Sequence, residues 1–218
     1  MMEQVVVDTG RNPRHAVVWL HGLGADGHDF EPIVPQLSAA SARAVRFIFP
    51  HAPVRPVTIN GGLPMRAWYD IFGVDIDRNQ DAEGIAASVA AIDALLDEQL
   101  AAGIEPHRII LAGFSQGGAI ALRCGLARAP ALGGVVGLST YLLGADSLDE
   151  WANGNELPPV FMGHGTQDPI VPAALGESSA RRLEEAGYAV QWQAWPMAHS
   201  VCAEEIAALD AWLDARWS

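Results

Sequence analysis

Cysteine is scarce in this chain, and so are apolar runs long enough to span a membrane. The two cysteines among the 218 residues, Cys124 and Cys202, belong to no C-x-x-C pair or His cluster, so we expect neither a disulfide nor a metal site. Cys124 stands in an apolar run and is expected to be a small buried side chain. No uncharged apolar run reaches the roughly 18 residues of a membrane-spanning helix, so no stable membrane insertion is expected.

Positive charge is scarce as well. The chain has 13 Lys and Arg against 26 Asp and Glu, which gives a formal net charge of −13. An acidic surface repels phosphate backbones and anionic membranes, and no basic run offsets it, so we expect no nucleic-acid partner. The first residues, MMEQVVVDTG, show no basic segment followed by an apolar core. They predict a cytoplasmic protein without a signal peptide.

What the chain does contain is an alternation of short apolar runs and helical patterns. The runs predict strands at 15–22, 44–50, 108–114, 132–139, 158–165 and 188–195. The middle runs are almost continuously apolar, which is typical of parallel strands buried on both faces. We therefore predict one α/β domain over residues 1–218, with a mostly parallel central sheet and helices on both faces.

The helical patterns are clearest in two segments. Between an N-cap at Asp81 and a C-cap at Gly103, apolar residues recur in steps of three and four, at Ile85, Val89, Ile92, Leu96 and Leu100. The C-terminal segment shows similar spacing at Cys202, Ile206, Leu209 and Leu213. The segment after Ser115 is apolar almost all round and predicts a helix packed deep against the sheet.

Two long connections, 51–80 and 141–157, do not fit this alternation. Each follows a predicted strand and so leaves from the carboxyl edge of the sheet, where open α/β sheets bind ligands. Irregular connections of this length are usually functional or mobile. We therefore expect both to be long loops beside the binding site.

The stretch GFSQG at 113–117 matches G-x-S-x-G between a predicted strand and a predicted helix. The two glycines let strand and helix approach closely while the Ser115 hydroxyl stands free. A helix that begins at the serine would aim its partial positive charge at a tetrahedral oxyanion. Five residues alone also suit an ordinary tight turn, but in this context the motif predicts Ser115 as a nucleophile.

Hydrolases with this type of turn place the acid and then the base after the serine. Only His164 and His199 follow Ser115, and we choose His199 because it lies between the last predicted strand and the last helix. Asp168, on the loop after the preceding strand, is predicted to orient His199, and His164 to pack under that loop. Rival acids in the 141–157 segment are Asp146, Asp149 and Glu150.

The predicted oxyanion donors are the backbone N–H groups of Leu23 and Gln116. Gln116 follows the nucleophile, and Leu23 lies in HGLGADG just after an early strand. The glycines of this loop, Gly22, Gly24 and Gly27, also match a bare G-x-G-x-x-G. However, EPIVPQL follows with two prolines, and the next strand ends in FIFPHAP without an acidic residue, which argues against a nucleotide-binding loop.

Four segments together carry a family resemblance: VVWLHGLGADGHDFEPIVPQL, FIFPHAPVRPVTINGGLPMRAWYDI, ILAGFSQGGAIAL and GHGTQDPIVP. They resemble the bacterial carboxylesterases of the phospholipase/carboxylesterase family, whose eukaryotic relatives are the acyl-protein thioesterases, over about residues 16 to 213. The resemblance implies an α/β-hydrolase fold, the triad Ser115, Asp168 and His199, and oxyanion donors at Leu23 and Gln116. Such relatives are often dimers, so a homodimer is a further expectation.

The expected activity is hydrolysis of small carboxylic esters of short to medium chain length, through an acyl-enzyme and without a metal or cofactor. The alternative on the same triad is an acyl-protein thioesterase or a lysophospholipase. A peptidase and a non-catalytic binding module are less favoured, because no extra domain selects peptides and every catalytic part is present. Candidates for the acyl-binding wall, some of which could instead be core, are Leu63, Met65, Trp68, Ile71 and Phe72.

Overall fold

The computed structural model of the protein describes residues 2–73, 80–152 and 156–217, and its centre is a seven-stranded sheet. The strand order is β1-β3-β2-β6-β7-β8-β9. β1 pairs antiparallel with β3, and the other pairs in this sheet are parallel. The strands are β1 (Gln4–Asp8), β2 (His15–Leu20), β3 (Val45–Pro50), β6 (Ile109–Phe114), β7 (Gly134–Leu138), β8 (Val160–Gly165) and β9 (Val190–Trp195). This arrangement confirms the predicted α/β class.

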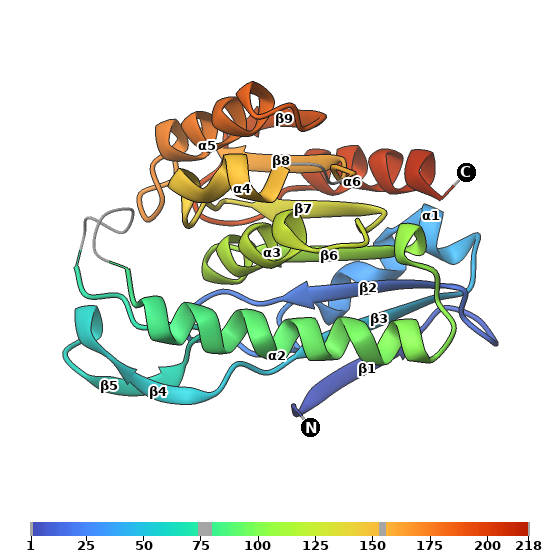
Figure 1. The fold of residues 1–218 in the computed structure, drawn as a ribbon, viewed down its shortest axis with the longest axis horizontal. Helices are drawn as coiled ribbons and strands as arrows, with labels where there is room; N and C mark the ends of the chain where they lie inside the picture. Colours follow the sequence, from blue (N-terminus) through green and yellow to red (C-terminus); the bar gives the residue numbers. More distant parts are fainter. Residues whose placement is uncertain (1, 74–79, 153–155, 218) are drawn as a thin grey trace.

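Helices cover both faces of the sheet (Figure 1). On one face lie α2 (Ala82–Ala101), α3 (Gln116–Ala127), α4 (Leu148–Ala152) and α5 (Ala173–Glu185), and on the other α1 (Ser38–Ser41) and α6 (Ala203–Arg216). Short 3-10 helices complete the chain: η1 (Glu31–Gln36), η2 (Thr58–Asn60), η3 (Pro106–Arg108) and η4 (Ala145–Ser147). Among the helices of the described residues, none combines the length and the apolar character that a bilayer crossing requires.

Alternate side chains of β2 pack into two separate hydrophobic cores, one on each face of the sheet. Helices on both faces are required to bury them. Val18 and Leu20 pack with α2, whereas Val17 and Trp19 pack with α6. Successive side chains of a strand point to opposite faces, so a strand that is apolar throughout is buried on both. The continuous apolar runs of the sequence therefore predicted correctly that these strands lie in the centre of the sheet.

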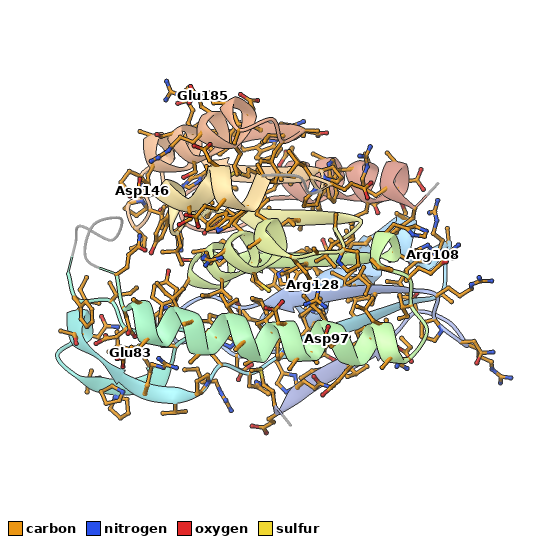
Figure 2. The ribbon with its side chains drawn as sticks, viewed as in Figure 1. Glu83, Asp97, Arg108, Arg128, Asp146 and Glu185 are labelled. Carbon is orange, nitrogen blue, oxygen red and sulfur yellow. The ribbon has the colours of Figure 1, made fainter. Side chains whose placement is uncertain are left out.

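The two predicted amphipathic helices form as α2 and α6. The Asp81 carboxylate caps α2 by accepting the N–H of Gly84 at 3.0 Å, and Gly103 follows the helix end with a left-handed φ of 89°. In α6, Leu209 and Leu213 are buried, whereas Cys202 precedes the helix as its N-cap residue. Arg128, the C-cap residue of α3, connects this helix to α2, because it bonds Asp93 at 2.7 Å and also pairs with Asp97 (Figure 2).

Three strands were not predicted. β1 alternates partly buried and exposed residues at the sheet edge, and five residues give too short a pattern to recognise. The 51–80 connection, expected to be an irregular loop, contains a hairpin of β4 (Val54–Val57) and β5 (Leu63–Arg66). The hairpin was not predicted because both of its strands contain a proline, which argues against a strand in the interior of a sheet. Proline is tolerated here because each strand has only one neighbour. The 141–157 connection likewise contains η4 and α4.

Candidate active site

Ser115 stands at the turn between β6 and α3, with φ 55° and ψ −121°, a conformation that residues other than glycine rarely adopt. A Cβ at Gly113 would lie 2.4 Å from the Gly117 carbonyl carbon, and a Cβ at Gly117 would lie 2.4 Å from the His21 carbonyl oxygen. Both positions therefore require glycine. The helix begins at Gln116, one residue later than expected, and Ser115 is its N-cap residue.

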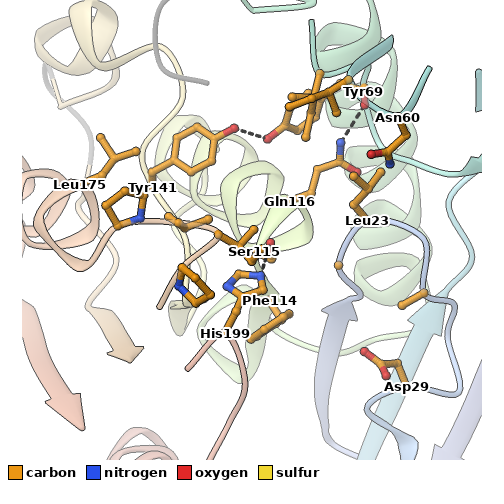
Figure 3. A pocket seen from close by; sticks show the side chains of 18 of the residues that line it. Leu23, Asp29, Asn60, Tyr69, Phe114, Ser115, Gln116, Tyr141, Leu175 and His199 are labelled. Atoms are coloured by element: carbon orange, nitrogen blue, oxygen red, sulfur yellow. Dashed lines mark hydrogen bonds between the residues drawn. The ribbon is translucent and has the colours of Figure 1, made fainter. Parts of the chain in front are cut away.

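The three residues of the predicted triad lie in line at the carboxyl edge of the sheet, and Figure 3 shows two of them, Ser115 and His199. His199, on the loop after β9, has its Nε2 2.9 Å from Ser115 Oγ and its Nδ1 2.7 Å from Asp168 Oδ2. This arrangement requires the proton on Nδ1, which donates to Asp168 and leaves Nε2 free to accept from the serine. Ser115 and His199 are separated by 84 residues in the chain and meet only because β6 and β9 end at the same edge.

Asp168 is held in place by the backbone of its own loop. Its Oδ1 accepts the N–H groups of Ile170 at 2.8 Å and Val171 at 2.9 Å, which leaves Oδ2 for His199, and its side chain is fully buried. His164 lies under this loop as expected: its Nε2 donates to the Val171 carbonyl at 2.9 Å, and burial lowers the pKa of its ring. A neutral His164 therefore supports the acid loop without adding a charge beside Asp168.

The rival acids do not share this environment. Asp146 lies on η4 with a fully exposed side chain that pairs with Arg182 at 3.5 Å. Asp149 and Glu150 are exposed on α4. These three carboxylates are therefore solvated, whereas the Asp168 side chain is buried and bonded to His199.

The segments that carry the two expected oxyanion donors border one cavity. Leu23 and Gln116 line it together with Ser115 and His199. The turn that holds Leu23 is fixed from outside, because the N–H of Gly24 donates to the Arg66 carbonyl at 2.8 Å. His21, which precedes this turn, donates from Nδ1 to the Gly22 carbonyl at 2.7 Å and accepts the Ala52 N–H on Nε2 at 3.0 Å. Burial lowers the pKa of His21, which favours this neutral form.

The cavity beside Ser115 has a volume of about 1060 Å³ and a largely apolar wall. Tyr69 and Tyr141 form part of this wall, and their hydroxyls meet at 2.8 Å (Figure 3). Burial raises the pKa of Tyr69 well above its ordinary value, so the Tyr69 phenol stays protonated. Other apolar residues that line the cavity are Ile59, Phe114, Ile170, Val171 and Leu175.

Only one of the five expected acyl-wall residues lines this cavity, and that is Ile71. Trp68 is fully buried and belongs to the core, as the alternative for these residues allowed. Leu63 and Phe72 are largely exposed, and Met65 lies on β5 with its sulfur 3.2 Å from the Asn60 amide. The wall residues that the sequence did not indicate come from three places: other positions of the 51–80 connection, the chain at and beyond the ends of β6 and β7, and the Asp168 loop with the start of α5. They are Ile59, Tyr69, Phe114, Tyr141, Ile170, Val171 and Leu175.

No group of three or more His, Cys, Asp or Glu side chains within the described ranges is arranged to hold a metal ion. The groups that the structure does bring together are a serine, a histidine, a carboxylate and an apolar cavity. Chemically, such a set suits acyl transfer to a serine hydroxyl.

Comparison with known proteins identifies the family and several relatives of this chain. The family described as Phospholipase/Carboxylesterase matches residues 1–216. "Acyl-protein thioesterase 1" of Gibberella zeae is 41% identical over 207 residues, which are 90% of this chain and 88% of that protein. The protein of the same name from Neurospora crassa is 40% identical over 92% of this chain and 86% of its own length.

Solved structures give the same result. Arabidopsis thaliana SOBER1 superposes with a TM-score of 0.86 and 30% identity, over 94% of this chain and all of that one. Zea mays acyl-protein thioesterase 2 superposes with a TM-score of 0.85 and 28% identity over the full length of both chains. The expected resemblance to bacterial members is thus supported at the level of the family, since these relatives are fungal and plant proteins. The chain belongs to the phospholipase/carboxylesterase family and is a hydrolase with the α/β-hydrolase fold.

Proposed function

We propose that this hydrolase releases acyl groups from thioesters, acyl-protein thioesters in particular, with activity on oxygen esters of the same acyl groups. The sequence indicates this activity as the alternative to a simple carboxylesterase. The observation that carries the chemistry is the position of His199, bonded to both Asp168 and Ser115 at the mouth of an apolar cavity. The names of the fungal relatives favour a thioester over a simple carboxylic ester as the preferred substrate.

In the proposed mechanism, Ser115 Oγ attacks the thioester carbonyl carbon while its proton passes to His199 Nε2. The carbonyl oxygen becomes an oxyanion that accepts from the Leu23 and Gln116 N–H groups. When the carbon–sulfur bond breaks, His199 returns the proton to the leaving sulfur, and the acyl group stays on Ser115. Water then attacks the acyl carbon and gives a proton to His199. The bond between the acyl carbon and Ser115 Oγ breaks, His199 passes the proton to Oγ, and the carboxylic acid is released.

The cavity supports an aliphatic acyl group. Its wall is built from Ile59, Ile71, Tyr141 and Leu175, and an alkyl chain that lies against such side chains gains about 0.8 kcal/mol for each methylene removed from water. Neither the acyl length nor the leaving group is fixed by the triad itself. A homodimer and a cytoplasmic location stay predictions.

The test compares the wild-type protein with Ser115→Ala in two steps. A fluorophosphonate probe should label the wild type and not the variant, and labelling that survives the substitution would refute the role of Ser115. The rates of hydrolysis are then compared for an S-acylated cysteine peptide, p-nitrophenyl esters of increasing chain length and a lysophospholipid. We expect the highest kcat/KM on the S-acylated peptide. A higher value on the simple esters would instead favour the carboxylesterase activity, and one on the lysolipid a lysophospholipase.

A further inference from the structure

Both polar atoms of the Gln116 side chain form hydrogen bonds away from the catalytic serine. Its Oε1 accepts the Trp68 N–H at 2.9 Å, and its Nε2 donates to the Tyr69 carbonyl at 2.7 Å. Both ends of the amide thus hold two successive backbone groups of one segment, and Figure 3 shows the second of these bonds. Gln116 is 2% exposed, so the two bonds lie in a medium of low polarity, where a missing partner is costly.

The segment that Gln116 holds is itself bonded to the turn that carries Leu23. Trp68 is fully buried, and its indole Nε1 donates to the His21 carbonyl at 2.9 Å, two residues before Leu23. Two residues before Trp68, the Arg66 carbonyl accepts the N–H of Gly24 at 2.8 Å. The Trp68 carbonyl is in turn bonded by the Ser88 hydroxyl of α2. The backbone on both sides of Leu23 is therefore fastened to residues 66–68.

These contacts connect the two halves of the expected oxyanion hole. One donor comes from the start of α3 and the other from the turn after β2, and they have no covalent connection nearby. The path from one to the other runs through the Gln116 side chain, Trp68 and the His21 carbonyl. The two segments also touch directly where Gly117 contacts the same His21 carbonyl. This contact is possible because glycine has no Cβ.

We propose that the Gln116 side chain is a positioning residue that sets the spacing between the Leu23 and Gln116 N–H donors through Trp68. The inference rests on the proposed function, because it requires an oxyanion at this place. Its consequence is that Gln116 acts twice, once through its backbone N–H and once through its amide. Donors aimed at a developing charge are effective only when they need no reorganisation, so a small displacement of Leu23 raises the barrier without weakening substrate binding.

The experiment uses Gln116→Met, which retains the backbone N–H and nearly the same side-chain shape but removes both amide bonds. The matched control is Gln99→Met, since Gln99 is a buried glutamine on α2, outside the residues that line the cavity. Rates are measured per active site, titrated with the fluorophosphonate probe, so that loss of folded protein does not enter kcat. We expect kcat for Gln116→Met to fall about 10- to 100-fold with KM within about twofold, and the control to keep both values.

An inhibitor provides a direct measure of the oxyanion hole. A trifluoromethyl ketone adds to the serine and places an oxyanion between the donors, so its affinity for Gln116→Met should fall by the same factor as kcat. If Gln116 serves only the stability of the fold, unfolding temperature falls while kcat per titrated site and inhibitor affinity stay at wild-type values, and the proposal is overturned.

A conservative variant adds a pH readout. In Gln116→Glu, the protonated carboxyl can accept from Trp68 and donate to Tyr69, as the amide does, whereas the ionised form cannot donate. We expect its kcat to approach the wild-type value at the acidic end of the activity range and to fall as pH rises, while wild-type kcat does not fall there. Equal profiles for the two proteins would contradict the positioning role. If the wild type itself shows no turnover that depends on Ser115, the proposed function has failed instead.

Discussion

The two sides of the cavity are built differently. On one side, Ser115, Asp168 and His199 follow strands of the main sheet, and each is held by backbone bonds or by its two catalytic neighbours. On the other side, residues 51–73 contain the small β4–β5 hairpin, which belongs to no larger sheet, and they contribute Ile59, Tyr69 and Ile71 to the wall. The first side is fixed by the topology of the fold, whereas the second depends on a few specific contacts.

Because of this difference, we expect one side of the cavity to govern the rate of the reaction and the other to govern which acyl group is preferred. The strand-end side contains the groups that must be aligned within tenths of an ångström, and a rigid sheet provides that precision. The hairpin side meets the acyl chain through apolar contact, which tolerates variation. Substitutions on the strand-end side should therefore stop the reaction, and substitutions on the hairpin side should change which substrate reacts fastest.

The strongest test of the strand-end side is Asp168→Asn. The Ile170 and Val171 N–H groups hold the amide oxygen, so the amide NH2 group faces His199 Nδ1 and donates to it. His199 then carries its proton on Nε2, the wrong tautomer to accept from Ser115, and kcat falls about 10⁴-fold. The matched control is Asp146→Asn, which changes an exposed rival acid of the same type and should leave kcat unchanged. Steady-state kinetics on a p-nitrophenyl ester measures both. A large loss in the control with little loss in Asp168→Asn would reverse the assignment of the acid.

The same side contains a carboxyl group that is not part of the triad. Glu205, in the first turn of α6 after the His199 loop, is fully buried against Gly163, and burial raises the pKa of its carboxyl to about 8. Between the ordinary value of 4.5 and about 8, the folded protein binds a proton that the unfolded chain releases. The free energy of unfolding therefore falls as pH rises through this window, by up to roughly 5 kcal/mol.

Glu205→Gln removes this dependence, because the amide does not titrate. We expect the unfolding free energy of the wild type to fall more than that of Glu205→Gln between pH 5 and pH 9. Urea denaturation at each pH measures both values. The control is Glu204→Gln, since Glu204 is adjacent in the chain but exposed and should leave the wild-type slope intact. Parallel pH profiles for Glu205→Gln and wild type would show that the buried carboxyl does not govern stability here.

The contrast between the two sides also explains what could be predicted from the sequence. Gly113, Ser115 and Gly117 are local signals of a sharp turn, and Asp168 and His199 follow from the order of strands, so the site's geometry was foreseeable. The acyl wall was not, because Tyr141 and Leu175 reach the cavity through long-range packing that has no period in the sequence. The role of the Gln116 amide was missed for the same reason, since Trp68 lies 48 residues away in the chain.

The smallest change that tests the hairpin side is Tyr69→Phe, which removes the hydroxyl bond to Tyr141 and leaves the ring in the wall. The wall becomes more apolar and its two halves lose one tie, worth about 1 kcal/mol, so the ratio of kcat/KM for long over short acyl chains should rise about fivefold. Tyr188→Phe is the matched control, because the Tyr188 hydroxyl bonds the Leu126 carbonyl at 3.2 Å outside the residues that line the cavity. A chain-length series of p-nitrophenyl esters measures the ratio. An unchanged ratio with reduced kcat on every ester would mean that this side, too, governs the reaction rather than the choice of acyl group.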